Sequence, residues 1–181
     1  MKRPAIYAII ALLVIVSCSQ QSVKKEIQDV KKSEVISDST PSKNVADASE
    51  ILSKREVPVL CYHHIREPKP GQSETMKSYS VSPESFAQQM KALKDSGYET
   101  ILPDDLYNYL VHGGKLPPKP VILSFDDTDE EQFSIGYQEM KKYGFKGVFF
   151  IMTISINRPR YMTTEQLKEL SDDGNAVEAH T

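Results

Sequence analysis

The chain has 181 residues, a length that suits one domain with appended segments. Hydrophobic residues make up 39% of the sequence and charged residues 26%, so there is enough apolar material for a core. The formal net charge is −3, which excludes the basic surface typical of nucleic-acid-binding proteins.

The first segment has the order of features of a bacterial lipoprotein signal peptide. Two basic residues precede an apolar run, residues 5–16, that is too short to span a bilayer. Ser17 and Cys18 close the run as in a lipobox, where the Cys thiol receives the lipid. We expect residues 1–17 to be a signal peptide and lipidated Cys18 to anchor the protein in the cell envelope, facing the periplasm or the exterior. An ordinary signal peptide, or a buried helix with an incidental Cys, is the alternative.

Residues 19–55 contain no aromatic residue and no glycine, and charged and small polar residues are mixed throughout. Such a segment cannot bury enough apolar surface to offset the entropy lost on ordering. We therefore predict a flexible tether over 18–55, beginning at the lipidated Cys, and a globular domain over 56–181. A short surface helix within 46–54 is the alternative.

In this domain, short apolar segments typical of strands alternate with segments of about ten residues typical of helices. This alternation predicts an α/β fold with parallel strands. The expected strands are 57–62, 98–102, 121–125, 147–151 and 176–179, and the expected helices are 83–96, 103–111, 132–143 and 164–170. Residues 66–80 are expected to form a polar loop. Cys61, within the first strand, is expected to be a small buried apolar residue.

Two adjacent carboxylates, Asp126 and Asp127, follow the most apolar strand. In parallel α/β folds, active sites form at the C-terminal ends of the strands. Neighbouring carboxylates repel each other, and a bound cation relieves the repulsion. His180 follows a later strand and would face the same end of the sheet. Asp and His together suit zinc or a similar divalent ion.

Each of these residues also has a structural interpretation. Asp126 and Asp127 could cap the following helix, and His180 could be a core histidine. The acidic residues 129–131 are expected to form a solvated first helical turn and not to bind metal. His63 is a candidate for lining the substrate site, although a hydrogen-bonding role at the strand end is equally favoured.

Three segments resemble motifs of the NodB-type polysaccharide deacetylases, carbohydrate esterase family 4. Residues 124–128, Ser-Phe-Asp-Asp-Thr, resemble the family's Thr-Phe-Asp-Asp-Gly motif. Residues 180–181, His-Thr, resemble the start of its second motif, His-Ser/Thr-any-any-His, and residues 58–65 resemble its Tyr-His segment at the first strand. The resemblance covers about residues 57–181. Thr128 stands where the family has Gly, which is expected to narrow the space beside the metal and to change the local turn.

The resemblance implies a distorted (β/α) barrel, of which this sequence supplies about the first half. It implies that Asp126 is the catalytic base and that Asp127 and His180 bind a divalent metal, most readily Zn²⁺, with Co²⁺, Ni²⁺ or Mn²⁺ as alternatives. A third ligand would lie three residues beyond Thr181. We therefore expect this polypeptide alone to have little activity.

The implied reaction is metal-dependent hydrolysis that removes acetyl groups from a polysaccharide containing N-acetylglucosamine. The expected partners are this polysaccharide and the membrane, through the lipid anchor. One alternative is an envelope lipoprotein that uses a degenerate deacetylase fold to bind glycan without catalysis. A less favoured alternative is a phosphatase of the haloacid-dehalogenase type, because Asp127 and Asp129 fit its Asp-any-Asp pattern, whereas Glu131 does not fit the residue expected next.

Overall fold

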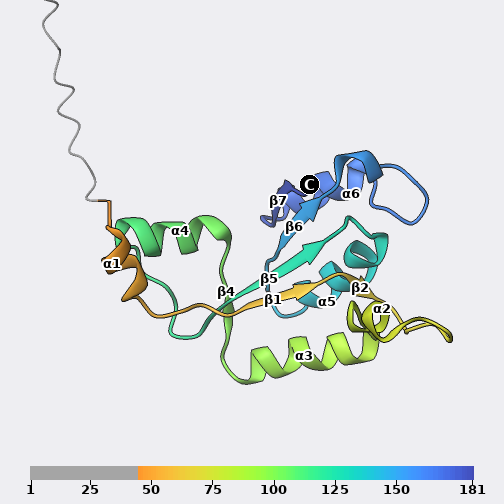
Figure 1. The fold of residues 1–181 in the computed structure, drawn as a ribbon, viewed down its shortest axis with the longest axis horizontal. Coiled ribbons are helices and arrows are strands. Elements are labelled where there is room, and N and C mark those ends of the chain that lie inside the picture. Colours follow the sequence, from red (N-terminus) through yellow and green to blue (C-terminus); the bar gives the residue numbers. More distant parts are fainter. Residues whose placement is uncertain (1–44) are drawn as a thin grey trace, which may run out of the picture. The chain divides into compact units, whose positions relative to one another are not determined.

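The computed structural model describes residues 45–181. The expected signal peptide, Cys18 and most of the expected tether therefore lie outside the described residues. The elements, shown in Figure 1, are α1 (Ala48–Leu52), β1 (Val59–Tyr62), β2 (His64–Ile65), α2 (Glu74–Ser78), β3 (Ser80–Val81), α3 (Pro83–Asp95), β4 (Glu99–Thr100), α4 (Pro103–His112), β5 (Pro120–Asp126), the π-helical segment η1 (Gln132–Tyr137), α5 (Gln138–Lys141), β6 (Val148–Ile151), the 3-10 segment η2 (Thr153–Ser155), α6 (Thr164–Asp172) and β7 (Ala176–Ala179).

The described strands form a parallel sheet, which confirms the predicted fold class. Its order is β1-β5-β6-β7, and β4 pairs with the beginning of β5. All the pairings in this sheet are parallel, with Cys61 opposite Ser124 and Phe150 opposite both Asp126 and Glu178. The short strands β2 and β3 form a separate parallel pair.

Alternating residues of the strands face two different environments, as the pleat of a strand requires. Leu123, Phe125 and Phe149 belong to the large core, which also contains residues of α3, α5 and α6. Ile122 and Val148 belong to a smaller cluster on the other face, against which Phe150 packs. We call this second face the inner face, and the same alternation assigns Asp126 to it.

Helix α3 shows how local sequence sets the element boundaries. The Ser82 side chain caps the helix by accepting a hydrogen bond from the Ser85 backbone N–H, and Pro83 occupies the first turn. Phe86 and Met90, four residues apart, are both fully buried against the sheet. The helix ends at Asp95, and Gly97 follows with a φ of 73°, a left-handed conformation that glycine adopts without steric cost.

Two segments differ from the expectations. The expected loop over 66–80 contains α2, capped by Ser73, and the beginning of β3. The last part of the expected tether forms α1, as the alternative prediction of a short helix within 46–54 stated. An Asp47 capping box starts α1, and the Ala46 backbone N–H donates to the Val111 carbonyl at the end of α4, 2.8 Å away.

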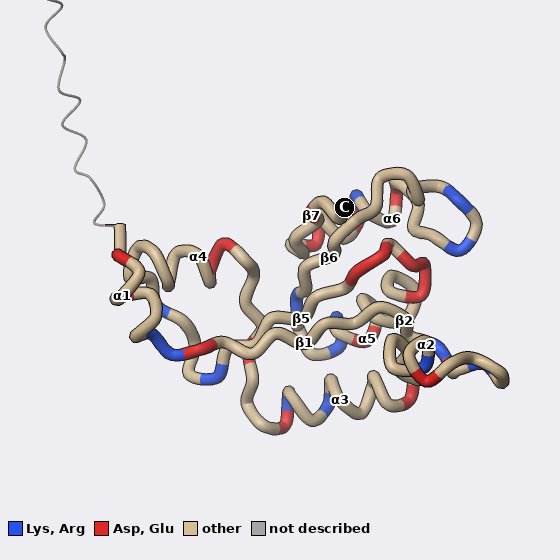
Figure 2. The backbone as a smooth tube through the Cα atoms, viewed as in Figure 1, with Lys and Arg blue, Asp and Glu red and all other residues tan. Residues whose placement is uncertain are grey.

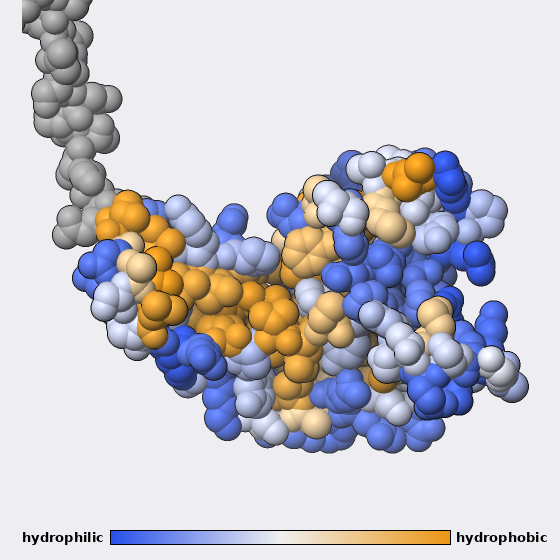
Figure 3. All heavy atoms as spheres, viewed as in Figure 1, coloured by the Kyte–Doolittle hydropathy of each residue, from blue (hydrophilic) through white to orange (hydrophobic). Residues whose placement is uncertain are grey.

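Apolar residues gather on one side of the molecule over α1 and β1, as Figure 3 shows. Exposed side chains there include Leu52, which is 85% exposed, and Val59, which is 53% exposed. The surface around the C-terminal ends of β1 and β5 is mostly hydrophilic in the same view. None of the helices within residues 45–181 has the length and apolar character needed to cross a membrane.

Candidate active site

The turn after β5 presents the two adjacent carboxylates at the C-terminal end of the sheet. Asp126 is the last residue of β5, and the next two residues, Asp127 and Thr128, both have positive φ values of 80° and 67°. Consecutive left-handed residues are unusual for side chains other than Gly and Asn, and such strain is frequent at functional sites. Figure 2 shows that this turn begins an acidic segment of the backbone.

Thr128 explains how a β-branched residue is accommodated in this turn. Its side chain is fully buried, and its hydroxyl accepts a hydrogen bond of 2.7 Å from the Met152 backbone N–H beyond β6. Its carbonyl accepts another from the Met162 backbone N–H, at 3.0 Å. Thr128 thus occupies a left-handed conformation that suits Gly, and its hydroxyl connects this turn to the residue after β6.

The side chains predicted for the site converge. His180 follows β7, and its Nε2 lies 3.4 Å from Asp127 Oδ1 and 3.8 Å from Asp126 Oδ2. The His180 backbone N–H donates to the Ile151 carbonyl at the end of β6, which fixes its position relative to the sheet. Asp126, Asp127 and His180 are each about a quarter to a third exposed, so a ligand can reach them.

His63 joins the same group from the end of β1. Its Nε2 lies 3.8 Å from Asp126 Oδ2, on a carboxylate oxygen that also faces His180. The preceding residue, Tyr62, points to the opposite face, where it stacks on Phe125 and donates a hydrogen bond to Gln89. Burial raises the pKa of the Tyr62 phenol to about 12, so this residue stays neutral beside the core.

Gln132 connects the backbones of the two site strands, and the sequence analysis did not identify it. The side chain is fully buried at the start of η1, and its Nε2 donates to the His63 carbonyl at 2.8 Å and to the Asp126 carbonyl. A π-helical segment often marks a functional site. The sequence offers no signal for the contact with His63, because Gln132 lies 69 positions further along the chain.

The expectation of a solvated acidic turn over 129–131 is wrong for two of its residues. Asp129 is only 6% exposed, and its Oδ2 lies 2.8 Å from Nδ1 of His64. Glu131 contacts Arg66, with 3.3 Å between Oε1 and Nη1. Burial raises the pKa of Asp129 and of Glu131 and lowers that of His64, so the enclosed site disfavours their charged forms. The guanidinium of Arg66 supplies the permanent positive charge of this cluster.

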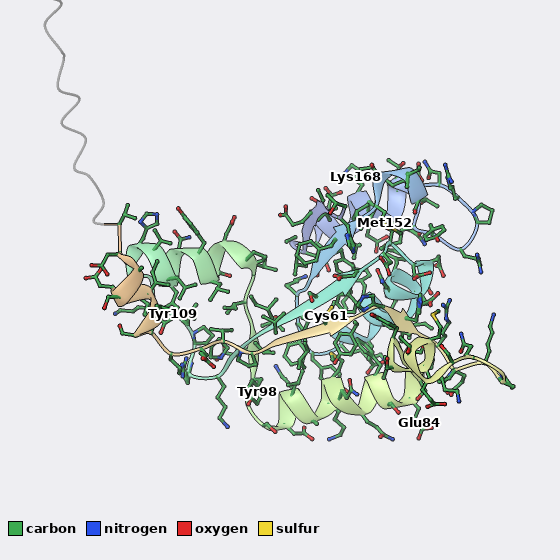
Figure 4. All side chains as sticks on the ribbon, in the orientation of Figure 1. Cys61, Glu84, Tyr98, Tyr109, Met152 and Lys168 are labelled. Carbon is green, nitrogen blue, oxygen red and sulfur yellow. The ribbon has the colours of Figure 1, made fainter. Side chains whose placement is uncertain are left out.

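The expectation that Cys61 is buried in the core is also wrong. Cys61 is exposed on β1, where Figure 4 labels it, and it occupies the inner face opposite Ser124. Its Sγ lies 4.0 Å from His63 Nδ1. Burial of the thiol is nevertheless sufficient to raise its pKa. The error came from the apolar run around it, which hides the alternation between the two faces.

The chemistry of this donor set fits a divalent cation. Carboxylate oxygens and imidazole nitrogens are ligands that zinc and related ions accept. Besides the pair formed by Asp127 and His180, the potential ligand atoms of Cys61, His63 and Asp126 all lie within 4.8 Å of one another. The described residues thus offer potential metal ligands at the ends of β1, β5 and β7.

Comparisons with known proteins give similarities to polysaccharide deacetylases. A family model described as polysaccharide deacetylase matches residues 113–181. YxkH of Bacillus subtilis, named as a polysaccharide deacetylase, is 32% identical over 126 residues. The poly-beta-1,6-N-acetyl-D-glucosamine N-deacetylase of Staphylococcus aureus is 30% identical over 115 residues. The matched residues make up 70% and 60% of this chain but only 42% and 39% of these relatives, so the chain spans less than half of their length.

A solved structure extends the similarity to the fold. The Streptococcus pyogenes deacetylase PplD, in complex with acetate, matches with a TM-score of 0.62 at 30% sequence identity. The match covers 69% of this chain and 56% of that one. The family model, the curated relatives and the shared fold identify part of a polysaccharide deacetylase domain in this chain.

Proposed function

We propose that the protein is a metal-dependent deacetylase that removes N-acetyl groups from a polysaccharide containing N-acetylglucosamine. The observation that carries the proposal is the convergence of Asp126, Asp127 and His180 at the C-terminal ends of β5 and β7, with His180 Nε2 3.4 Å from Asp127 and 3.8 Å from Asp126. Two carboxylates and an imidazole at one strand edge provide both metal ligands and a proton acceptor.

Each residue takes a separate role in this proposal. Asp127 and His180 would hold the divalent ion, most readily Zn²⁺, which when bound polarises the acetyl carbonyl and lowers the pKa of water. Asp126 would accept the proton of the attacking water as general base. His63, on the same carboxylate oxygen as His180, would fix the orientation of Asp126.

The substrate class rests on the named relatives. The staphylococcal relative is named for deacetylation of poly-beta-1,6-N-acetyl-D-glucosamine. The side chain of Asp127 is about a third exposed, so the site is open to solvent. An open site suits a polymer that binds along the protein surface. We propose the same chemical class, an N-acetylglucosamine polymer, for this protein.

The test uses the product of the complete coding sequence of the gene and measures acetate release from N-acetylglucosamine oligomers. Wild-type protein should release acetate, and a chelator should stop the release. Asp126→Asn should lower kcat by about 10²- to 10⁴-fold, the contribution typical of a general base, while metal content stays unchanged. Asp95→Asn, which alters an exposed carboxylate on α3, is the matched control.

Two results would contradict the proposal. Full activity in Asp126→Asn would show that Asp126 is not the general base. Glycan binding without any acetate release by the wild-type protein would instead favour the non-catalytic lipoprotein that binds glycan.

We also propose that the protein is anchored in the cell envelope through lipid on Cys18. The support is the order of basic residues, the apolar run 5–16 and the Ser-Cys pair at 17–18. Cells grown with a labelled fatty acid should incorporate the label into the wild-type protein and not into Cys18→Ala. Equal labelling of both proteins would exclude this anchor.

A further inference from the structure

The thiol of Cys61 lies beside the proposed active site and has no role in the proposed reaction. Cys61 is exposed on β1, two positions before His63, so both side chains lie on the inner face of the sheet. Cys61 pairs with Ser124 of β5, and Asp126 follows two positions later on the same face. Two neighbouring strands therefore bring a thiol, an imidazole and a carboxylate together.

The distances among these three groups are close to those of a metal site. Cys61 Sγ lies 4.0 Å from His63 Nδ1, and His63 Nε2 lies 3.8 Å from Asp126 Oδ2. Each group offers one ligand atom that lies within 4.8 Å of the ligand atoms of the other two. The bonds of a tetrahedral zinc site, about 2.0–2.3 Å long, put neighbouring ligand atoms about 3.5 Å apart. The three groups therefore need to approach one another by only about 1 Å to share an ion.

This set of groups is separate from the pair formed by Asp127 and His180. In the sheet, β1 lies on one side of β5, and β6 and β7 lie on the other. His63 and His180 thus approach Asp126 from opposite sides, each with 3.8 Å between its Nε2 and Asp126 Oδ2. The two sets also differ in chemistry, because a thiolate favours Zn²⁺ over harder ions such as Mg²⁺ and Mn²⁺.

We propose that Cys61, His63 and Asp126 bind a second Zn²⁺ ion, and that this ion inhibits deacetylation. A carboxylate bound to the second ion is a weaker proton acceptor, so the ion takes the general base out of the reaction. The inhibition, unlike the site itself, rests on the proposed deacetylase function.

The second ion is expected to bind more weakly than the first. A thiol has to lose its proton to solvent before it can bind an ion. Burial raises the pKa of the Cys61 thiol, and the nearby charge of Asp126 adds to this effect. The pair formed by Asp127 and His180 therefore fills first, and the second ion binds only when Zn²⁺ is in excess.

Cobalt(II) reports the site directly, because a thiolate bound to Co²⁺ gives a charge-transfer absorption band in the near ultraviolet. The metal-free product of the complete coding sequence is titrated with Co²⁺. The band should appear in the wild type and persist in Asp127→Asn, which removes a ligand of the first ion only. It should be absent from Cys61→Ser. Cys18→Ala, at the other cysteine of the sequence, is the matched control and should keep the band.

Calorimetry with Zn²⁺ measures the affinity for the second ion. Cys61→Ser and His63→Ala should each weaken it at least about tenfold, the lower limit of what even a group that only supports a ligand contributes. Thermal unfolding in the presence of a chelator shows whether the variants are folded. A single equivalent of Zn²⁺ whose affinity falls in both Cys61→Ser and Asp127→Asn would show one shared ion and overturn the second site.

Acetate release from N-acetylglucosamine oligomers tests the inhibition, with rates compared within each variant at one equivalent of Zn²⁺ and in excess. Saturation of the second site should slow the wild type at least about 100-fold, the lower limit of what a general base contributes. Cys61→Ser should lose this slowing. Equal inhibition of both proteins would overturn the inhibitory ion and leave the deacetylase function standing. A Co²⁺ band that depends on Cys61, in a protein that releases no acetate, would support the metal site and contradict the deacetylase function.

Discussion

At the scale of single residues, Thr128 combines a conformational cost with a specific contact. A β-branched residue at a φ of 67° is costly, by about 1–2 kcal/mol, because its Cβ crowds the backbone. The hydroxyl offsets this cost by accepting the Met152 backbone N–H at 2.7 Å in a fully buried position. The Thr128 hydroxyl is therefore one of the contacts that hold the turn presenting Asp126 and Asp127.

Thr128→Val should destabilise the protein by about 1–3 kcal/mol, because it keeps the strain and removes the acceptor. Thr128→Ser keeps the acceptor with less crowding at Cβ and should match the wild type within about 0.5 kcal/mol. Urea unfolding followed by circular dichroism measures both changes. Thr75→Val, at an exposed position of α2, is the control. Equal stability of the Val and Ser variants would mean that the hydroxyl contributes nothing.

At the scale of elements, the segment from Gln132 to Lys141 shows what the sequence could and could not predict. A helix over 132–143 was expected, and a helical segment is present, but its first six residues are π-helical. The caps Ser82 and Thr163 were predictable because capping depends on local sequence. The π-helical segment was not, and Gln132 at its start bonds to the carbonyl groups of His63 and Asp126, a contact that no local sequence pattern marks.

For the candidate site as well, the sequence identified residues marked by a local pattern and missed those brought together by distant contacts. Asp126, Asp127 and His180 were identifiable because each directly follows an apolar strand, and parallel strands end at one edge of a sheet. His64 and Asp129 were not identified as a pair, because no local pattern relates β2 to the turn that follows β5. Cys61 was misplaced because a fully apolar strand gives no sign of which residues face inward.

Gln132→Met should loosen the site while it preserves the volume of the side chain. The substitution leaves the His63 and Asp126 carbonyls without their donor, and an unsatisfied buried group costs about 1–3 kcal/mol. Thermal or urea unfolding should show that loss, and metal affinity measured by calorimetry should fall as well. Gln88→Met on the exposed side of α3 should change neither property. A stable variant with unchanged metal affinity would contradict a positioning role for Gln132.

At the scale of the whole molecule, the inner face of the sheet collects groups from strands that are distant in sequence. Cys61 lies on β1 and Asp126 on β5, whereas His63 directly follows β1 and His180 directly follows β7. The large core on the opposite face, where helices α3, α5 and α6 pack, holds these strands in register. Chemistry and packing are thus divided between the two faces, and an ion bound by Asp127 and His180 would link β5 to β7.

This link predicts that metal binding stabilises the fold. Zn²⁺ at about 100 times its Kd should add about 2.7 kcal/mol, because the ion binds the folded state and not the unfolded one. For a chain of this length, that gain corresponds to a rise of about 5–10 °C in the thermal midpoint. A chelator should reverse the rise, Asp127→Asn and His180→Ala should abolish it, and Asp95→Asn should preserve it. A rise that persists in Asp127→Asn and disappears in His64→Ala would instead place the ion among His64, Asp129 and Glu131, whose ligand atoms also lie within 4.8 Å of one another.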